Sequence, residues 1–161
     1  MKKPESGCCP KFNPKLWDKK TKVFKDKLFV KDHVTSFLHI PLNFGKVMIR
    51  NMNKIWNAKA SPKKWSENIL LSDEKSLWGS DIYIGVSKKV PNATNVKVSG
   101  TYLTKVYEGP YKDMSKWIKD MKAYVLSKKK TIKKILFFYT TCPKCAKFYG
   151  KNYVVLLAKV R

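Results

Sequence analysis

The sequence predicts an α+β fold made of two repeated units, in which helices lie on one face of an antiparallel sheet. Segments rich in β-branched and aromatic residues alternate with segments whose apolar residues recur at helical spacing. The order strand, helix, strand occurs twice along the chain. Of the 161 residues, 43% are hydrophobic, which is enough to bury a core.

The first unit follows a basic arm. Residues 1–28 are rich in lysine and contain three prolines, so we expect them to be irregular. The segment 33–40, "HVTSFLHI", predicts a strand that ends at Pro41. Residues 43–58 carry apolar side chains at helical spacing and predict a helix, with Asn43 as its cap. After a polar connection, residues 81–87 predict the next strand. We expect this first module to span about 29–98.

The second unit repeats this order over about 99–161. Residues 100–109 predict a strand, and a Gly-Pro turn leads into a helix over 111–129 with an apolar stripe. Residues 132–141 and 152–160 are apolar runs that predict two further strands. Together the two modules would form one domain over residues 29–161.

The charge of this chain is strongly positive, at +24. Lysines that neutralise phosphates favour non-specific binding to nucleic acid at low salt. However, only Arg50 and Arg161 are arginines, and arginine is the residue that reads bases and clamps phosphates with two hydrogen bonds. The lysines are also spread along the whole chain. We therefore expect a solvated basic surface, with nucleic-acid binding that is at most non-specific.

No segment approaches the roughly 18 consecutive apolar residues of a membrane-spanning helix. The sequence before the first cysteines, "MKKPESG", has no apolar stretch of the kind that precedes secretion or lipid attachment. These features predict a cytoplasmic protein that does not enter a membrane. We expect a monomer or a homodimer.

Three segments carry a resemblance to a known family. The strand, turn and tryptophan-bearing helix of "GTYLTKVYEGPYKDMSKWIKDM" (100–121) resemble the second module of the GyrI-like superfamily. The segment "FGKVMIRNMNKIW" (44–56) is similar to the helix of the first module, and "DIYIGV" (81–86) to a strand. The resemblance covers roughly residues 29–160.

This resemblance implies two strand-helix-strand-strand modules around a central groove that takes small molecules. Members of the superfamily include a gyrase inhibitor, effector-binding domains of transcription regulators, and proteins that hydrolyse cyclopropane-bearing DNA alkylators. The chain has no predicted helix-turn-helix before the modules, so it resembles a stand-alone member. The ligand that the resemblance implies is a flat aromatic or hydrophobic small molecule.

The four cysteines form two close pairs, Cys8 with Cys9 and Cys142 with Cys145. A C-x-x-C after a strand is typical of thioredoxin-like redox sites, but the 16 residues that follow Cys145 leave no room for that fold. Zinc held by all four thiolates is an alternative, although adjacent cysteines seldom reach one ion together. We favour thiols that pack as small apolar groups and expect no cofactor, with zinc left open.

The region between the last two predicted strands departs from the superfamily pattern. Drug-binding relatives have a buried acidic residue near these strands, where it meets a cationic ligand. This chain has "CPKCAK" at that point and no acid, so a cation-binding role does not carry over to it.

The remaining candidate site residues are an acid and a set of aromatic side chains. Glu108 ends a predicted strand, and a carboxylate at the groove beside aromatic rings would have a raised pKa suited to general-base work on water. Tyr111 would donate a proton to the leaving group. The expected ligand-binding side chains are Trp78, Tyr102, His39 and Phe138. Asp73 and Glu74 are expected to cap a helix or to lie in a solvated loop.

Three functions fit these features. The first is a GyrI-like protein that binds small molecules and hydrolyses reactive or xenobiotic electrophiles of the cyclopropane type. The second is a module that sequesters drugs or binds a partner such as gyrase without chemistry. The third is a zinc-stabilised basic protein that binds nucleic acid non-specifically, which predicts affinity that falls steeply with salt.

Overall fold

The fold was obtained as a computed structural model that describes residues 4–38 and 40–161. It confirms a mixed α+β class with antiparallel strands. The chain divides into two compact units. Unit 1 contains residues 1–24 and 100–161, and unit 2 contains residues 25–99. The N-terminal arm therefore belongs to the same unit as the second half of the chain.

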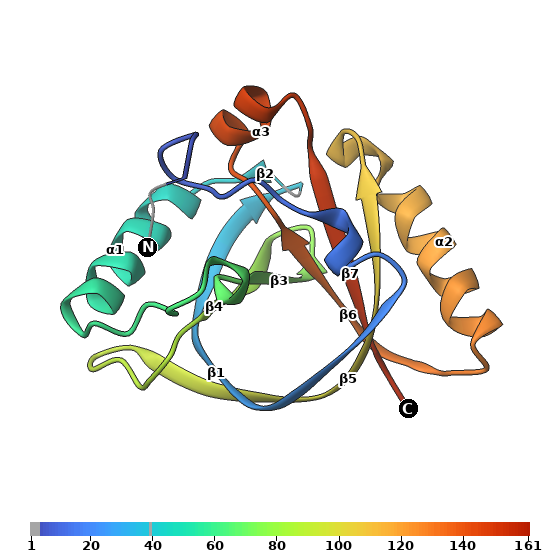
Figure 1. Cartoon of the computed structure of the whole chain (residues 1–161), viewed down its shortest axis with the longest axis horizontal. Helices are drawn as coiled ribbons and strands as arrows, with labels where there is room; N and C mark the ends of the chain where they lie inside the picture. The colour runs from blue at the N-terminus through green and yellow to red at the C-terminus, as the bar shows by residue number, and fades with distance from the viewer. Residues whose placement is uncertain (1–3, 39) are drawn as a thin grey trace. The chain divides into compact units, whose positions relative to one another are not determined.

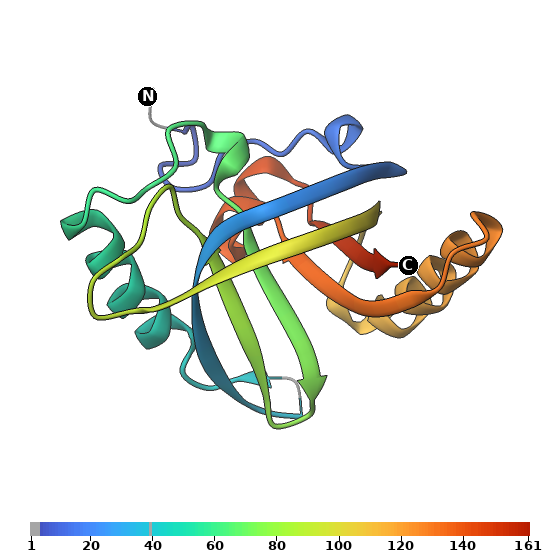
Figure 2. The same cartoon turned by 90° about the horizontal axis from the view of Figure 1, so that it is seen from below.

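Unit 2 is built on an antiparallel arrangement of strands. The long strand β1 (Lys20–Phe37) pairs with β4 (Gly79–Gly85), and β4 pairs with β3 (Leu70–Ser76). The two-residue strand β2 (Ile40–Pro41) folds back onto the end of β1. Figure 2 shows the green β3–β4 hairpin running beside the later part of β1. Pro41 therefore lies within a short pairing strand, after a turn.

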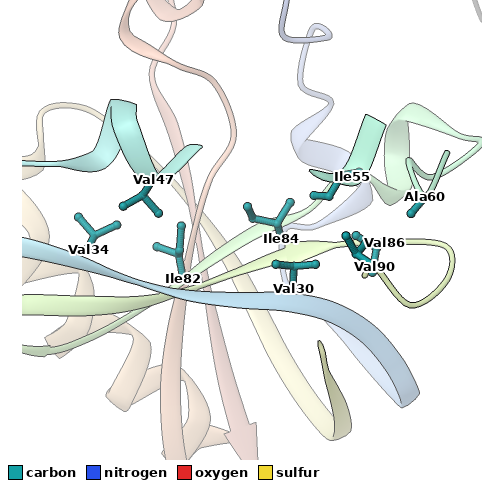
Figure 3. Packing of buried hydrophobic residues seen from close by; sticks show 9 residues of the cluster. All are labelled: Val30, Val34, Val47, Ile55, Ala60, Ile82, Ile84, Val86 and Val90. Atoms are coloured by element: carbon teal, nitrogen blue, oxygen red, sulfur yellow. The ribbon is translucent and has the colours of Figure 1, made fainter. Parts of the chain in front are cut away.

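Helix α1 (Phe44–Asn57) covers one face of these strands. Its buried side chains Val47 and Ile55 point toward Val34, Ile82 and Ile84 of the sheet (Figure 3). The other members of this core are Val30, Ala60, Val86 and Val90. Asn43 precedes the helix, but its side chain accepts a hydrogen bond from the Thr35 backbone N–H (2.9 Å) and does not cap the helix. The helix is thus held mainly by burial of its apolar stripe.

In unit 1 the strands β6, β7 and β5 pair antiparallel in that order. Strand β5 (Thr94–Glu108) enters this unit at Gly100, and β6 (Ile132–Tyr139) and β7 (Tyr153–Val160) complete the sheet. Helix α2 (Met114–Ser127) packs on one face through Trp117, Met121 and Val125 (Figure 1). Against them lie the sheet residues Leu103, Phe137, Val154, Leu156 and Ala158.

The N-terminal arm packs on the face of the unit 1 strands opposite to α2. Trp17 is buried and lies 5.2 Å from the ring of Phe138, and Phe12 lies 5.6 Å from the ring of Tyr153. Because neighbouring residues of a strand point to opposite faces, the even-numbered side chains of β5 near Thr104 face the arm. The sheet of unit 1 is therefore covered on one face by α2 and on the other by the arm.

Three elements differ from the sequence-based expectation. Strand β1 begins at Lys20, so the irregular part of the arm is shorter than expected. The segment with Asp73 and Glu74 was predicted as a loop or a helix cap, and this prediction is wrong because the segment forms β3. The short helix α3 (Pro143–Tyr149) was not predicted. Two short 3-10 turns, Pro14–Leu16 and Tyr111–Asp113, precede β1 and α2, and a third spans Trp65–Glu67.

Candidate functional site

An open pocket of about 500 Å³ lies on the arm face of the unit 1 sheet. We call it the arm-face pocket; its lining residues are Pro14, Lys15, Asp18, Lys20, Val106, Glu108 and Tyr153. The arm supplies the first four and the sheet supplies the other three. This size is within the range of pockets that hold small molecules. Two carboxylates and an aromatic ring thus share one pocket that a single ligand could fill.

Glu108 is at the pocket, but its environment differs from the one expected. Its Oε1 atom accepts a hydrogen bond from the Lys151 ammonium at 2.8 Å, and the Glu108 side chain is 48% exposed. Among the described residues, Lys151 is its one polar side-chain partner. The carboxylate is therefore paired with a lysine and exposed to solvent, whereas the sequence led us to expect aromatic rings that desolvate it. Oε2 remains available to water or ligand.

Asp18 holds the arm against the sheet beside Glu108. Its Oδ1 atom accepts a hydrogen bond from the Val106 backbone N–H at 3.1 Å. Two residues before Val106, the buried Thr104 hydroxyl donates to the carbonyl oxygen of Trp17, and the carbonyl oxygen of Lys20 lies 3.2 Å from the same hydroxyl. These contacts fix the arm from Trp17 to Lys20, the stretch that forms one wall of the pocket.

Sequence reasoning missed Asp18 and Tyr153 as pocket residues and Lys151 as the partner of Glu108. Tyr153 is the direct cross-strand partner of Glu108 in the pairing of β5 with β7. Directly opposed residues have side chains on the same face, which places the phenol ring beside the carboxylate. The signal was present in the two predicted strands, because pairing them at their ends aligns these positions. The role of Asp18 had no comparable signal, since the arm was expected to be irregular.

Tyr111 lies in the turn before α2 and is 45% exposed. Its ring meets that of Tyr139 edge to face at 5.4 Å. Burial raises the pKa of the Tyr111 hydroxyl, and the nearby Cys142 adds to the effect. The phenol thus stays protonated at neutral pH and can act as a hydrogen-bond donor. It is not among the lining residues of the arm-face pocket, and its catalytic role stays a prediction.

The expected ligand-binding aromatics are in different surroundings. Tyr102 is 2% exposed and packs against Phe24 at 5.1 Å. Phe138 is buried between the rings of Phe12 and Trp17. Trp78 belongs to unit 2, where it is 60% exposed and contacts Phe37 at 5.7 Å. His39 lies outside the described residues. The groove between modules and its contacts with these side chains stay predictions.

A second open pocket, of about 530 Å³, lies in unit 2 beside α1. Its one carboxylate, Asp32, already accepts hydrogen bonds from Arg50 (2.7 Å) and Asn51 (2.6 Å). Burial raises the pKa of Asp32, but these bonds and the backbone N–H of His33 outweigh it and lower the pKa below the usual value. This carboxylate is committed to holding α1 to β1, so the arm-face pocket is the better candidate site.

The four cysteine side chains come together in unit 1. Cys142 precedes α3, Cys145 lies in its first turn, and Cys8 and Cys9 come from the arm. Their sulfur atoms all lie within 4.8 Å of one another, and all four cysteines are free thiols. The C-x-x-C thus lies at the start of a helix that was not predicted, and the arm brings the other pair of cysteines to it.

The thiols of this cluster differ in acidity. Burial raises the pKa of Cys8 and of Cys9, in the latter case to about 11. Burial acts in the same direction on Cys145, but hydrogen bonds from Ser6 and Cys8 outweigh it and lower the pKa of Cys145 to about 6. Cys145 is therefore more acidic than Cys8 and Cys9, and the groups around it favour its thiolate form.

Comparisons with known proteins place this α+β chain in a family. The family model described as "Bacterial hydrolase" matches residues 1–160, so the chain belongs to the bacterial hydrolase family. No curated protein matches it. Its fold is similar to the structure of SAV2435 bound to tetraphenylphosphonium, with 12% identity, coverage of 88% of this chain and 93% of that chain, and a TM-score of 0.53. At this identity the similarity shows the fold alone.

Among the described residues, no helix is long and apolar enough to cross a membrane.

Proposed function

We propose that this protein binds a small, flat aromatic or hydrophobic molecule in the arm-face pocket and hydrolyses a reactive electrophile there. The observation that carries the proposal is the position of Glu108 in that pocket, in a chain of the bacterial hydrolase family. The fold shared with the drug-bound SAV2435 supports a small-molecule role and is consistent with membership of the GyrI-like superfamily.

The pocket has both an apolar and a polar side. Pro14, Val106 and the Tyr153 ring offer surface to a flat ligand, while Glu108 and Asp18 offer carboxylates. A ligand stacked on the ring of Tyr153 would lie beside Glu108, because the two residues are cross-strand partners. This arrangement brings the reacting centre of a bound ligand within reach of a base.

In this proposal Glu108 orients a water molecule through its free Oε2 atom and takes its proton. The water oxygen forms a bond to a carbon of a strained, activated cyclopropane ring. The ring carbon–carbon bond breaks, and its electron pair moves to the conjugated carbonyl oxygen. That oxygen takes a proton from a tyrosine hydroxyl, and the proton that Glu108 accepted passes to the tyrosinate through water. The enzyme then returns to its starting state, and the net change is the addition of one water. Tyr153 lines the pocket, which makes it a second candidate donor beside Tyr111.

The test is mass spectrometry of a flat aromatic, cyclopropane-bearing alkylator incubated with the purified protein. Multiple turnovers that add one water are expected for the wild type, and Glu108→Gln should lower the rate by at least about a hundredfold, the usual contribution of a general base. Glu67→Gln changes an exposed glutamate in unit 2 and is the matched control. If Glu108→Gln kept turnover within a factor of a few, its assignment as base would be wrong.

A non-catalytic role in the same pocket is favoured by one observation. Glu108 is ion-paired with Lys151 and half-exposed, an environment that suits recognition of a polar group as well as it suits catalysis. A sequestering protein would bind the alkylator and leave its mass unchanged. Saturable binding without hydrolysis would therefore favour drug sequestration over the hydrolase.

A further inference from the structure

The four thiols are arranged as a compact group of donors. The Cys8 sulfur lies 3.4 Å from that of Cys9, 3.6 Å from that of Cys142 and 3.3 Å from that of Cys145. The two pairs are separated in sequence by more than 130 residues, as the Cys8–Cys142 spacing of 134 shows. Thiols that only fill space in a core, as expected from the sequence, have no reason to bring all four sulfurs together at one point.

The spacing of the sulfurs fits a tetrahedral metal ion. With zinc–sulfur bonds of about 2.3 Å, four thiolates at the corners of a tetrahedron are about 3.8 Å apart. The sulfurs of this cluster lie between 3.3 Å and 4.8 Å from one another, on both sides of that value. A disulfide would instead bring two sulfurs to about 2.05 Å and leave the other two out.

Backbone and side-chain contacts hold both pairs in place. The Cys142 backbone N–H points at the Cys9 sulfur at 3.4 Å. The carbonyl oxygen of Cys9 accepts hydrogen bonds from the Ser6 hydroxyl (2.7 Å) and the Tyr149 hydroxyl (2.9 Å), and Tyr149 ends α3. The loop that carries Cys8 and Cys9 is thus tied to α3, which follows Cys142 and contains Cys145. Such outer contacts are typical of metal ligands, whose positions they fix.

We propose that Cys8, Cys9, Cys142 and Cys145 form a structural Zn²⁺ site that fastens the N-terminal arm to α3. The objection from the sequence was that adjacent cysteines seldom reach one ion, and the sulfurs of Cys8 and Cys9 do lie on the same side. Four thiolates select zinc over the harder divalent cations. They also leave no open position for water or substrate, which makes the site structural and not catalytic.

The charge around the cluster suits this assignment. A zinc ion with four thiolates carries a net charge of 2−, and burying it requires compensation. Lys144 and Lys147 are exposed on α3, the helix that contains Cys145 and directly follows Cys142. The chain as a whole has a net charge of +24. A doubly negative centre is therefore stabilised by its surroundings.

The experiment is elemental analysis of the full-length protein, purified under reducing conditions and washed with a chelator. About one zinc ion per chain is expected. Cys145→Ser should weaken zinc binding by at least about tenfold, because loss of even an outer-shell partner of a ligand has an effect of this size. The control is Lys147→Ser, which introduces the same serine at an exposed position of the same helix and should retain the zinc.

A second measurement keeps the proposal testable if Cys145→Ser does not fold. Co²⁺ exchanged into the wild type should give the visible absorption of a tetrahedral ion and a sulfur-to-cobalt charge-transfer band. The proposal would be overturned by wild-type protein with no stoichiometric metal and no such bands. Disulfide bonds among these cysteines would also overturn it. Each disulfide would lower the intact mass of freshly purified protein by two hydrogen atoms. These outcomes do not depend on whether the arm-face pocket hydrolyses anything.

Discussion

The attachment of the arm can be tested at one buried hydroxyl. Thr104 is fully buried, and its hydroxyl donates to the carbonyl oxygen of Trp17 with the carbonyl of Lys20 3.2 Å away. Thr104→Val keeps the shape of the side chain but leaves the buried carbonyl oxygen of Trp17 without its donor. An unsatisfied buried polar group costs about 1–3 kcal/mol. For a chain of this length, such a loss corresponds to a Tm lower by about 2–12 °C.

Urea denaturation and thermal melting measure this loss, with Thr101→Val as the matched control. Thr101 is exposed on the same strand, so its replacement should change stability by less than about 0.5 kcal/mol. Tryptophan fluorescence adds a local readout, because Trp17 is buried against Phe138 only while the arm is attached. Equal stability of the two variants would refute the view that this hydroxyl holds the arm to the sheet.

Three further outcomes are expected. Met121→Ala removes a fully buried side chain of α2 and should reduce the free energy of unfolding by about 2–5 kcal/mol, whereas Leu126→Ala, at a residue 74% exposed, should leave it nearly unchanged in the same urea titration. The lowered pKa of Asp32 means that its carboxylate stabilises the fold at pH values above 3.8, the usual pKa of the group, and that this stabilisation is lost as the pH falls through the folded-state pKa. Asn51→Leu removes one of the hydrogen bonds that lower this pKa, so stability measured as a function of pH should fall less steeply in acid. Chelation that strips zinc should expose the arm to limited proteolysis, and a cleavage pattern unchanged by chelation would contradict a structural role for the metal.

The fold class could be predicted from the sequence because the core elements have strong periodicity. The stripes on α1 and α2 and the apolar runs of β6 and β7 are buried as expected. Strand β3 escaped detection because "LSDEKS" is almost wholly polar, and its pairing with β4 holds it in the sheet. Helix α3 has only seven residues, and its sequence signals are limited to Pro143 at its start and Gly150 just after its end, where the structure shows a left-handed backbone.

The site was harder to predict than the fold. Glu108 could be singled out because acids are rare in this chain, yet its partner Lys151 is 43 residues away and no local pattern links them. Asp18 and Thr104 act through contacts with backbone groups of a distant segment, which leave no periodic trace. The cysteine pairs were visible in the sequence, but their convergence depends on the arm folding back onto α3.

The central claim, that the arm-face pocket holds a small molecule, is tested most directly by filling that pocket. Val106→Phe places a larger side chain beside Asp18 and Glu108, and Val23→Phe makes the same change at an exposed position in the same unit. Binding of the flat aromatic, cyclopropane-bearing alkylator is measured by tryptophan fluorescence, with circular dichroism as the check on folding.

The account predicts that Val106→Phe weakens binding by at least about tenfold, or 1.4 kcal/mol, while Val23→Phe binds as the wild type does. If folded Val106→Phe bound the alkylator with unchanged affinity, the ligand would lie elsewhere and the proposed site would be wrong.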